Sequence, residues 1–282
     1  MKIIDHLQGA HMLKTITIIG AAAISVAAIS AHAQTTAQLV QKTTQGQMVV
    51  GQTFKTPTGL TGVVLQTPKG EQPTLAYATA NNEYLVLGNI VSSKGVNLSE
   101  AYTETYINAR IAKKAYKLLP STHWFAQGSN KAPHKAYIVI DPNCIYCHLL
   151  YKEVYPMIES GKLQVRWIAA GFLRKTSEGK SARILVQATE AKKVAIFHKD
   201  EMKFKEKNES GGVTPLKKDA NSAAVSTAFA RVEANTTFFK TLGFQGTPTI
   251  IYRLNDGKST FYPGYAKGKQ LEKMVSSMSN KW

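Results

Sequence analysis

The chain has 282 residues, of which 44% are hydrophobic and 19% charged. This composition excludes a disordered, collagen-like or coiled-coil chain and predicts one or two globular domains. The two cysteines are too few for a disulfide-stapled scaffold or a four-cysteine zinc site. The formal net charge is +17, and no nucleic-acid-binding motif accompanies it. We expect most lysines to be solvated on helix faces, and a positive field that gathers acidic substrates or meets a membrane surface is the alternative.

The first 33 residues have the pattern of a secretory signal peptide. Lys14 precedes an apolar run at residues 16–29, and Ala31-His32-Ala33 follows it. The run is shorter than the roughly 20 residues that cross a bilayer, so a membrane anchor is the weaker interpretation. We expect cleavage after Ala33 and export of the remaining chain, with either Met1 or Met12 as the start.

Residues 34–98 are predicted to form a short helix and a small antiparallel sheet. The helix is expected at 36–43 and the strands at 48–50, 62–65, 74–79 and 83–88. Asn81-Asn82 separates the last two strands and suits a two-residue hairpin, because Asn tolerates positive φ. A sheet of this size with one apolar face usually needs a partner, which favours a dimer.

A single long helix is predicted over residues 99–119. Ser99 is expected to cap it and Pro120 to end it, and its apolar residues fall on one face: Ile107, Ile111, Ala115 and Leu118. Such a helix most simply links two compact regions. Packing inside one continuous domain is the alternative.

From residue 135 onward the chain alternates between strand and helix, which is the pattern of an α/β fold. A nearly continuous apolar strand at 135–140 precedes a helix at 144–160, in which Pro156 is expected to produce a kink. The remaining predicted elements are a strand at 163–170, helices at 177–198 and 221–242, strands at 249–253 and 258–262, and a helix from 267.

Both cysteines lie between the first of these strands and its helix, in Asp141-Pro142-Asn143-Cys144-Ile145-Tyr146-Cys147-His148. Unpaired N–H groups and the helix dipole favour an anion at a helix N-terminus, so we expect a low pKa for the Cys144 thiol. A stabilised thiolate is both a nucleophile and a good leaving group. Cys147, one turn further on, is close enough to form a disulfide with it. The segment therefore predicts a dithiol that exchanges with disulfides of other proteins.

Three other interpretations of the same segment stay open. The pattern C-x-x-C-H also attaches c-type haem, with His148 as the axial ligand. An inert structural disulfide would close too small a loop to stabilise the fold much. A metal site on Cys144, Cys147 and His148 lacks an evident fourth ligand. We expect His148 to lie on the helix surface and, together with Ile145 and Tyr146, to tune the thiols.

A second motif, Gly246-Thr247-Pro248-Thr249, comes directly before a predicted strand. A proline that enters a strand is unusual unless it lies at an edge or follows a cis peptide bond. A cis Pro248 beside the dithiol would leave the neighbouring backbone free to pair with an extended substrate. An ordinary turn proline is equally compatible with the sequence.

The two motifs together resemble the thioredoxin fold, and the chain after residue 33 resembles the periplasmic disulfide isomerases DsbC and DsbG. Two further segments carry this resemblance: Asn97-Leu98-Ser99-Glu100 and Ser121-Thr122-His123-Trp124. The single pair of cysteines is closer to DsbG, because DsbC has an additional pair. The dipeptide Ile145-Tyr146 departs from the Pro-Tyr of DsbG and the Gly-Tyr of DsbC, so a redox potential does not carry over.

The resemblance implies an α/β fold with a thioredoxin-like domain at 120–282 and an inserted helical subdomain at about 176–242. It also implies a small α+β N-terminal dimerisation domain at 34–98 and a linker helix at 99–119, arranged in a V-shaped homodimer. Mapped onto this sequence, Cys144 is the attacking thiol and Cys147 the resolving thiol, and Thr247 with cis-Pro248 binds substrate. No cofactor and no metal are implied.

The implied function is that of a periplasmic thiol–disulfide oxidoreductase that isomerises or reduces disulfides, with sulfenic-acid reduction and chaperone activity as further expected activities. Its implied partners are unfolded or misoxidised exported proteins and a DsbD-like membrane thiol reductant, with no nucleic acid. The alternatives are a non-catalytic periplasmic holdase and a c-type haem protein.

Overall fold

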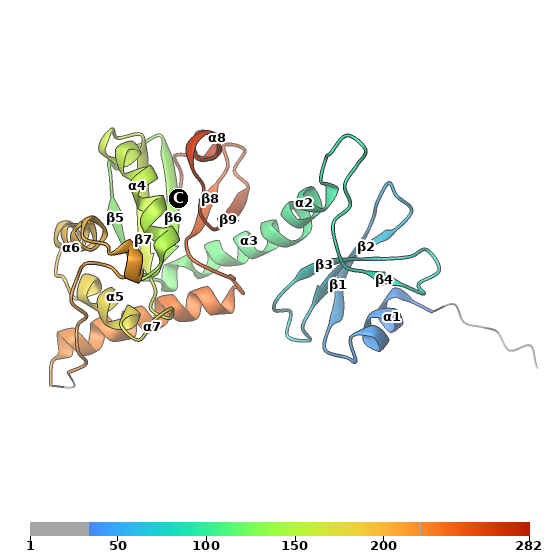
Figure 1. Ribbon diagram of the computed structural model, residues 1–282, viewed down its shortest axis with the longest axis horizontal. Coiled ribbons are helices and arrows are strands. Elements are labelled where there is room, and N and C mark those ends of the chain that lie inside the picture. Colours follow the sequence, from blue (N-terminus) through green and yellow to red (C-terminus); the bar gives the residue numbers. More distant parts are fainter. Residues whose placement is uncertain (1–33, 220) are drawn as a thin grey trace, which may run out of the picture. The chain divides into compact units, whose positions relative to one another are not determined.

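The computed structural model describes residues 34–219 and 221–282, so the predicted signal peptide at 1–33 lies outside the described residues. Two sheets organise the chain (Figure 1). One is four-stranded, in the order β1-β2-β3-β4, and the other is five-stranded, in the order β5-β7-β6-β8-β9. Among residues 34–219 and 221–282, no helix has the length and hydropathy of a membrane span.

The first sheet is antiparallel and packs against one short helix. Its elements are α1 (Thr36–Thr43), β1 (Val49–Lys55), β2 (Thr61–Gln66), β3 (Thr74–Ala78) and β4 (Leu85–Val86). Leu39 and Val40 of α1 are buried against Val63, Leu65 and Ala76 of the sheet. The predicted helix is confirmed, whereas β1 is longer and β4 shorter than the sequence predicted.

The predicted two-residue hairpin between β3 and β4 is wrong. The Thr79 N–H donates to the Tyr84 carbonyl over 3.1 Å, which leaves a loop of four residues, 80–83. A two-residue turn of the type that Asn favours needs positive φ at both central residues, and here only Asn82 has it, at 55°. The Asn81 side-chain oxygen instead accepts hydrogen bonds from the Glu83 N–H and the Thr79 hydroxyl.

The long helix consists of α2 (Leu98–Thr103), a π-helical segment (Glu104–Asn108) and α3 (Ala109–Leu118), and it ends in a 3₁₀ turn that contains Pro120. Ser99 does not cap it. Asn97 does, because its side-chain oxygen accepts from the N–H groups of Ser99 and Glu100. Ser99 is the second residue of α2 and is buried, and its hydroxyl oxygen accepts from the Ile90 N–H and bonds the Tyr77 hydroxyl.

The second sheet is built around β6 (His134–Ile140). This strand pairs in parallel with β7 (Leu163–Ala169) and antiparallel with β8 (Thr249–Arg253). The edge strands are β9 (Ser259–Pro263), beside β8, and β5 (Trp124–Gln127), beside β7. The sequence did not predict β5 as a strand. In this order β6 is the central strand of the sheet, and the loop that carries the cysteine motif follows it.

Alternating side chains of β6 divide the apolar core between the two faces of the sheet. Ile138 and Ile140 belong to a cluster with α4 (Ile145–Glu159) and α8 (Gly268–Ser277), whereas Tyr137 and Val139 belong to a cluster with α3 and α7 (Ala223–Thr241). Full burial of one such aliphatic side chain contributes about 1.5–3 kcal/mol. The helix layers therefore hold β6, and the loop after it, from both sides.

The helices between β7 and β8 are α5 (Ser177–Leu185), α6 (Glu190–Met202) and α7. The single helix predicted at 177–198 is wrong, because the chain breaks after Val186 and starts again where the Thr189 hydroxyl accepts from the Lys192 N–H. From β6 onward, the other predicted elements agree with the structure to within two residues. Pro156 lies inside α4, and Gly161, at φ 72°, follows its C-terminal end.

Candidate functional site

Cys144 is the N-cap residue of α4 and lies directly after the central strand. Its carbonyl accepts from the N–H groups of Cys147 and His148, each over 3.1 Å, and its own N–H donates to the Asp141 carbonyl over 2.9 Å. Both cysteines are free thiols and both are buried, with 6% of Cys144 and 2% of Cys147 exposed. The first thiol thus lies at the helix end where N–H groups are unpaired, as the sequence predicted.

The proline motif lies beside this thiol. The Cys144 Sγ donates to the Thr247 carbonyl over 3.1 Å, and the Thr247–Pro248 peptide bond is cis. The Gly264 N–H donates to the Pro248 carbonyl over 2.8 Å, and the Thr249 hydroxyl donates to the Gly246 carbonyl over 2.8 Å. The structure therefore brings together two motifs that are about a hundred residues apart in the sequence, and the prediction of a cis proline is confirmed.

The two thiols have opposite acid–base properties. The pKa of Cys144 is lowered to about 7, chiefly because the Cys147 side chain hydrogen-bonds its sulfur, with Thr247 and the Tyr146 and Cys147 backbone acting in the same direction against burial. The pKa of Cys147 is raised well above 9, mainly by burial and then by Cys144. Near neutral pH the first sulfur is therefore substantially ionised while the second keeps its proton.

Asp141 anchors the loop that carries the thiols, a role that the sequence analysis did not assign. Its carboxylate is 1% exposed and accepts four hydrogen bonds. One oxygen accepts from the Asn143 N–H and the Ser177 hydroxyl, and the other from the N–H groups of Phe172 and Leu173. A buried carboxylate is stable when its lone pairs are filled in this way. Asp141 thus ties the loop to the chain that follows β7.

His148 does not lie on the helix surface, so that prediction is wrong. It is 7% exposed, its ring stacks on Phe204 at 4.5 Å between centroids, and its Nδ1 is 3.0 Å from the Glu201 Oε2. Its position in the first turn of α4 turns it toward the inserted helices, which sequence periodicity alone does not reveal. Of the other two residues predicted to tune the thiols, Ile145 is half-buried and Tyr146 is 56% exposed.

A buried polar cluster lies at the end of α6, next to the same loop. The Gly211 N–H donates to the Pro142 carbonyl over 3.0 Å, and the Gly211 carbonyl accepts from the Lys180 ammonium. Asp200 accepts from the Val213 N–H over 2.7 Å, and burial raises its pKa to about 7. Burial also raises the pKa of Glu201, and it lowers that of Lys180. No sequence motif marks this cluster, because even Lys180, its member nearest to the cysteine motif, follows His148 by 32 residues.

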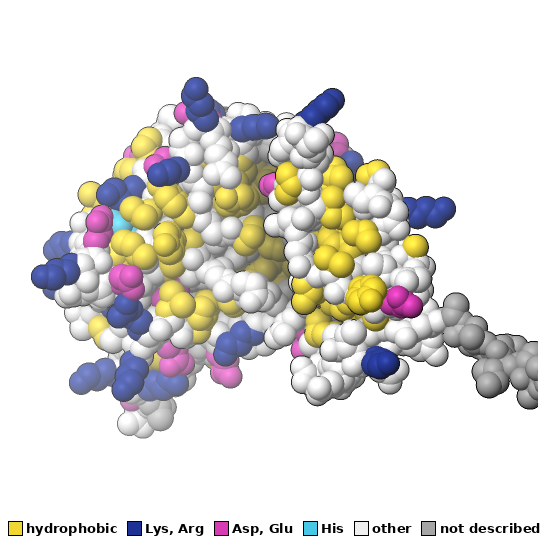
Figure 2. Space-filling model, turned by 45° about the vertical axis from the view of Figure 1, so that its right-hand side comes forward, with side chains coloured by type: hydrophobic (Ala, Val, Ile, Leu, Met, Phe, Trp, Pro, Cys, Tyr) yellow, Lys and Arg dark blue, Asp and Glu magenta, His cyan; other side chains and the backbone are white. Residues whose placement is uncertain are grey.

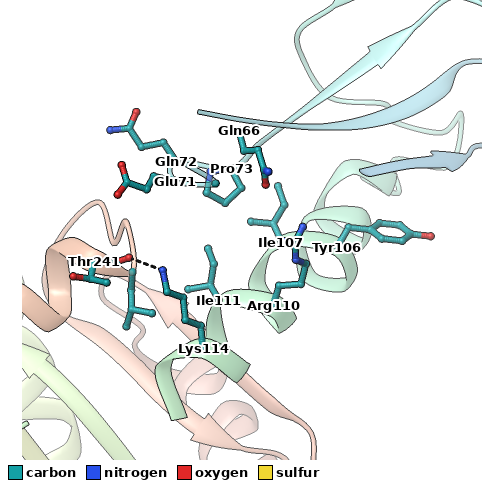
Figure 3. A pocket seen from close by; sticks show the side chains of 12 residues that line it. Gln66, Glu71, Gln72, Pro73, Tyr106, Ile107, Arg110, Ile111, Lys114 and Thr241 are labelled. Carbon is teal, nitrogen blue, oxygen red and sulfur yellow. Dashed lines mark hydrogen bonds between the residues drawn. The ribbon is translucent and has the colours of Figure 1, made fainter. Parts of the chain in front are cut away.

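Other features of the described chain lie away from the thiols. The pocket in Figure 3 is lined by residues of the β2–β3 connection, the long helix and the end of α7, and Lys114 donates there to the Thr241 carbonyl over 3.1 Å. Its lining contains no cysteine. A search of residues 34–219 and 221–282 found no group of three His, Cys, Asp or Glu side chains that could hold a metal ion.

Comparisons with known proteins agree with this geometry. The model of the thioredoxin-like domain family matches residues 126–279. The chain is 28% identical to the thiol:disulfide interchange protein DsbG of Pseudomonas aeruginosa over 232 residues, which cover 82% of this chain and 84% of that protein. It is also 28% identical to DsbG of Escherichia coli over 209 residues, which cover 74% of this chain and 78% of that protein. Among solved structures, the thiol-disulfide exchange protein α-DsbA2 of Wolbachia pipientis is 15% identical with a TM-score of 0.45, covering 60% of this chain and 94% of that one.

Proposed function

The chain belongs to the thioredoxin-like family and is a DsbG-like thiol–disulfide oxidoreductase, and on this basis we propose that Cys144 is its attacking thiol and Cys147 its resolving thiol. The observation that carries the proposal is the position of the Cys144 sulfur, at the N-terminus of α4 and 3.1 Å from the Thr247 carbonyl. A thiol with a pKa of about 7 is half ionised at neutral pH and attacks disulfides efficiently.

The reaction begins when the Cys144 thiolate attacks one sulfur of a substrate disulfide. The substrate S–S bond breaks, the departing sulfur takes up a proton, and a mixed disulfide forms. Cys147 then loses its proton, attacks the Cys144 sulfur and releases the second substrate thiol. The substrate disulfide gains two electrons and the enzyme dithiol loses two.

Two variations use the same first step. In isomerisation, another cysteine of the substrate displaces Cys144, so the enzyme leaves in its reduced form. With a sulfenic acid, the attack of Cys144 forms the mixed disulfide and releases water. The raised pKa of Cys147 supports isomerisation, because a protonated resolving thiol leaves the mixed disulfide time to rearrange.

Thr247 and Pro248 are proposed to bind the substrate chain beside its disulfide. The Thr247 carbonyl lies against the attacking sulfur, so a substrate that reaches Cys144 must pass the backbone of this loop. An extended segment that pairs with such backbone gains main-chain hydrogen bonds without dependence on its sequence. Ile145, Tyr146 and His148 are proposed to tune the redox potential of the dithiol.

The segment 34–98 is proposed as a dimerisation domain, joined by a linker helix at 99–119 to a catalytic domain at 120–282 with its insertion at about 176–242. Hydrophobic side chains gather on the N-terminal segment, at the right of Figure 2. Around and after the edge strand β4, the exposed ones are Tyr84, Val86, Leu87, Val91 and Val96. Exposed apolar groups at a sheet edge favour association. Sedimentation of residues 34–282 should give a dimer, and a monomer would contradict this part of the proposal.

We further propose that the protein acts in the periplasm after removal of residues 1–33, that a DsbD-like membrane protein keeps its dithiol reduced, and that it also has chaperone activity. The sequence pattern of those residues supports their removal and export, and the resemblance to DsbC and DsbG implies the reductant and the chaperone activity. Unfolded or misoxidised exported proteins are the proposed substrates.

Cys144→Ser tests the catalytic assignment. We expect it to abolish insulin reduction and the refolding of scrambled proteins, because serine cannot form the mixed disulfide. Cys147→Ala is the matched variant: it should keep the first attack and accumulate mixed disulfides with substrate. Alkylation of Cys144 should rise to half its maximum near pH 7. Unchanged insulin reduction by Cys144→Ser would refute the assignment.

The holdase alternative is supported by the same exposed apolar side chains. If aggregation of an unfolded client is suppressed equally by the Cys144→Ala/Cys147→Ala protein, chaperone activity is independent of the thiols. The haem alternative predicts a Soret band in the purified protein, and a colourless protein excludes it.

A further inference from the structure

The exposed apolar side chains of the catalytic region belong to segments that form or contact its active-site loop and the first turn of α4. Among large hydrophobic residues of the described chain after residue 119, those that are exposed are Tyr146, Leu173 and Met202. Tyr146 lies between the two cysteines, and the Leu173 N–H donates to Asp141 over 3.0 Å. Met202 follows Glu201, which bonds His148. Three separate elements thus each place one apolar side chain near the loop of Cys144.

A basic segment continues this surface from Met202. Of the four acidic side chains in residues 199–209, Asp200 and Glu201 are buried, whereas Glu206 and Glu209 are exposed and pair with Lys152 and Arg174. Lys203, Lys205 and Lys207 are exposed, and no carboxylate of the described residues lies within 4.0 Å of their ammonium groups. We call these three residues the lysine strip.

The lysine strip is held next to the thiols by several contacts. Phe204, between two of its members, stacks on His148, and Glu206 lies 3.6 Å from the His148 Nε2. Lys205 pairs with Ser210 in an isolated β-bridge, and the next residue, Gly211, donates to the Pro142 carbonyl. Pro142 and His148 flank Cys144 in the sequence. The segment that carries the lysine strip is therefore fixed against residues on both sides of Cys144 in the sequence.

We propose that the lysine strip, with Tyr146, Leu173 and Met202, is a recognition surface for client segments that carry acidic and apolar residues close to their reactive cysteine. The proposal rests on the function proposed above and adds a preference among clients. Its occupant is an unfolded polypeptide, because Cys144 is only 6% exposed and an extended chain reaches such a sulfur more readily than a folded surface does. Charge complementarity raises the rate of encounter, and the apolar side chains hold the segment after it arrives.

Symmetric disulfide-linked dimers of short peptides test this preference. One peptide has Leu and Glu residues around its cysteine, and the other has Leu and Lys residues at the same positions. The reduced full-length mature protein should react about tenfold faster with the acidic dimer at low ionic strength, the lower end of what steering delivers. At about 0.5 M salt, where screening is strong, the two rates should converge.

Two triple variants with the same net charge locate the effect. Lys203→Glu/Lys205→Glu/Lys207→Glu should abolish or reverse the preference for the acidic dimer. Lys131→Glu/Lys162→Glu/Lys281→Glu should keep it. Lys162 comes directly before β7, and Lys131 comes three residues before the parallel strand β6. Lys281 follows Ser279, whose carbonyl accepts from the Lys135 N–H near the start of β6, so all three lie at the opposite end of the sheet from Cys144.

The outcomes separate this proposal from the one on which it rests. Equal rates for the two peptide dimers at low salt would overturn the recognition surface. Equal loss of the preference in both triple variants would also overturn it, because the effect would then come from the overall charge of the protein. Reduction of the small neutral bis(2-hydroxyethyl) disulfide reports on the thiols alone and should be the same in both variants. Loss of the peptide preference with that reaction intact supports the lysine strip, whereas reduction that persists in Cys144→Ser would instead refute the catalytic assignment.

Discussion

The central sheet and the inserted helices are stabilised by different kinds of interaction. The core around β6 and α4 is aliphatic and aromatic, with Ile138, Ile140, Leu150 and Val154 all buried. The insertion contains three of the four buried Asp, Glu and Lys side chains of the described residues: Lys180, Asp200 and Glu201. Apolar burial does not depend on pH, whereas the stability of a buried carboxyl does.

This difference bears on function because the insertion contacts the active-site loop directly. Glu201 bonds His148, and Gly211 donates to the Pro142 carbonyl. The sheet therefore provides a fixed position for Cys144, and the insertion adds contacts whose strength changes with the ionisation of its acids. A variant on each side of this boundary should show whether the two parts respond differently to pH.

Asp200→Asn should have the largest effect, and it should appear as a change in pH dependence. The pKa of Asp200 is about 7 in the folded protein against 3.8 for a free carboxyl. Below pH 3.8 both states are protonated. As pH rises toward 7 the unfolded state ionises first, so the wild-type free energy of unfolding falls, by up to about 4 kcal/mol at 1.36 kcal/mol per pKa unit. Above pH 7 Asp200 is ionised in the folded protein as well, so the free energy of unfolding falls no further on its account.

Urea unfolding from pH 4 to pH 8 measures this effect. Asparagine keeps the shape of the side chain and an oxygen that can accept from the Val213 N–H, so the variant should lack this fall and be the more stable protein at pH 8. Parallel pH profiles for the wild type and the variant would show that Asp200 ionises as readily in the folded protein as in the unfolded one.

Leu150→Ala tests the apolar side of the comparison. Leu150 is completely buried in α4, and its truncation removes packing and leaves a cavity. We expect a loss of about 3 kcal/mol, within the usual range for buried leucines. The loss should be the same at pH 5 and pH 8 in urea unfolding. A loss that changes with pH by more than about 1 kcal/mol would mean that the two parts of the domain do not respond separately.

The apolar core could be predicted from the sequence because its pattern is local. The continuous apolar run at 135–140 and the helical spacing after Cys144 gave β6 and α4 to within one or two residues. The dithiol and its proline partner followed from the position of each motif relative to a predicted strand. The strand β5 was missed because it has only four residues, too few to show a clear periodicity.

The insertion and the neighbours of the thiols could not be predicted, because they depend on contacts between distant residues. The break between α5 and α6 is not marked by Gly or Pro. The buried position of His148 depends on Glu201 and Phe204, more than 50 residues away. Asp141 was part of the recognised motif, but three of its four hydrogen-bond donors (Phe172, Leu173 and Ser177) are distant in the sequence, and only the fold brings them to it.

Gly211→Ala should have the smallest of the three effects on stability, and it tests how tightly the insertion is held against the loop. A Cβ at this position would lie 2.2 Å from one Asp200 carboxylate oxygen and 2.5 Å from the other. The carboxyl must then move away from the Val213 N–H, at a cost of about 1–3 kcal/mol. Gly246→Ala is the control, since a Cβ there meets no atom within 4 Å.

A double variant identifies the cause of that cost. In an Asp200→Ala background the obstructing oxygens are absent, so adding Gly211→Ala should cost at least 1 kcal/mol less than it does in the wild type. If Gly211→Ala costs as much in that background as in the wild type, the strain lies in the backbone contact of Gly211 with Pro142 and not in the Asp200 carboxyl. The Gly211 N–H bonds the loop that carries Cys144. If the cost is undiminished, alkylation of Cys144 should therefore also be slower in Gly211→Ala. If Asp200→Ala reduces the cost, the alkylation rate of Gly211→Ala should be close to that of the wild type.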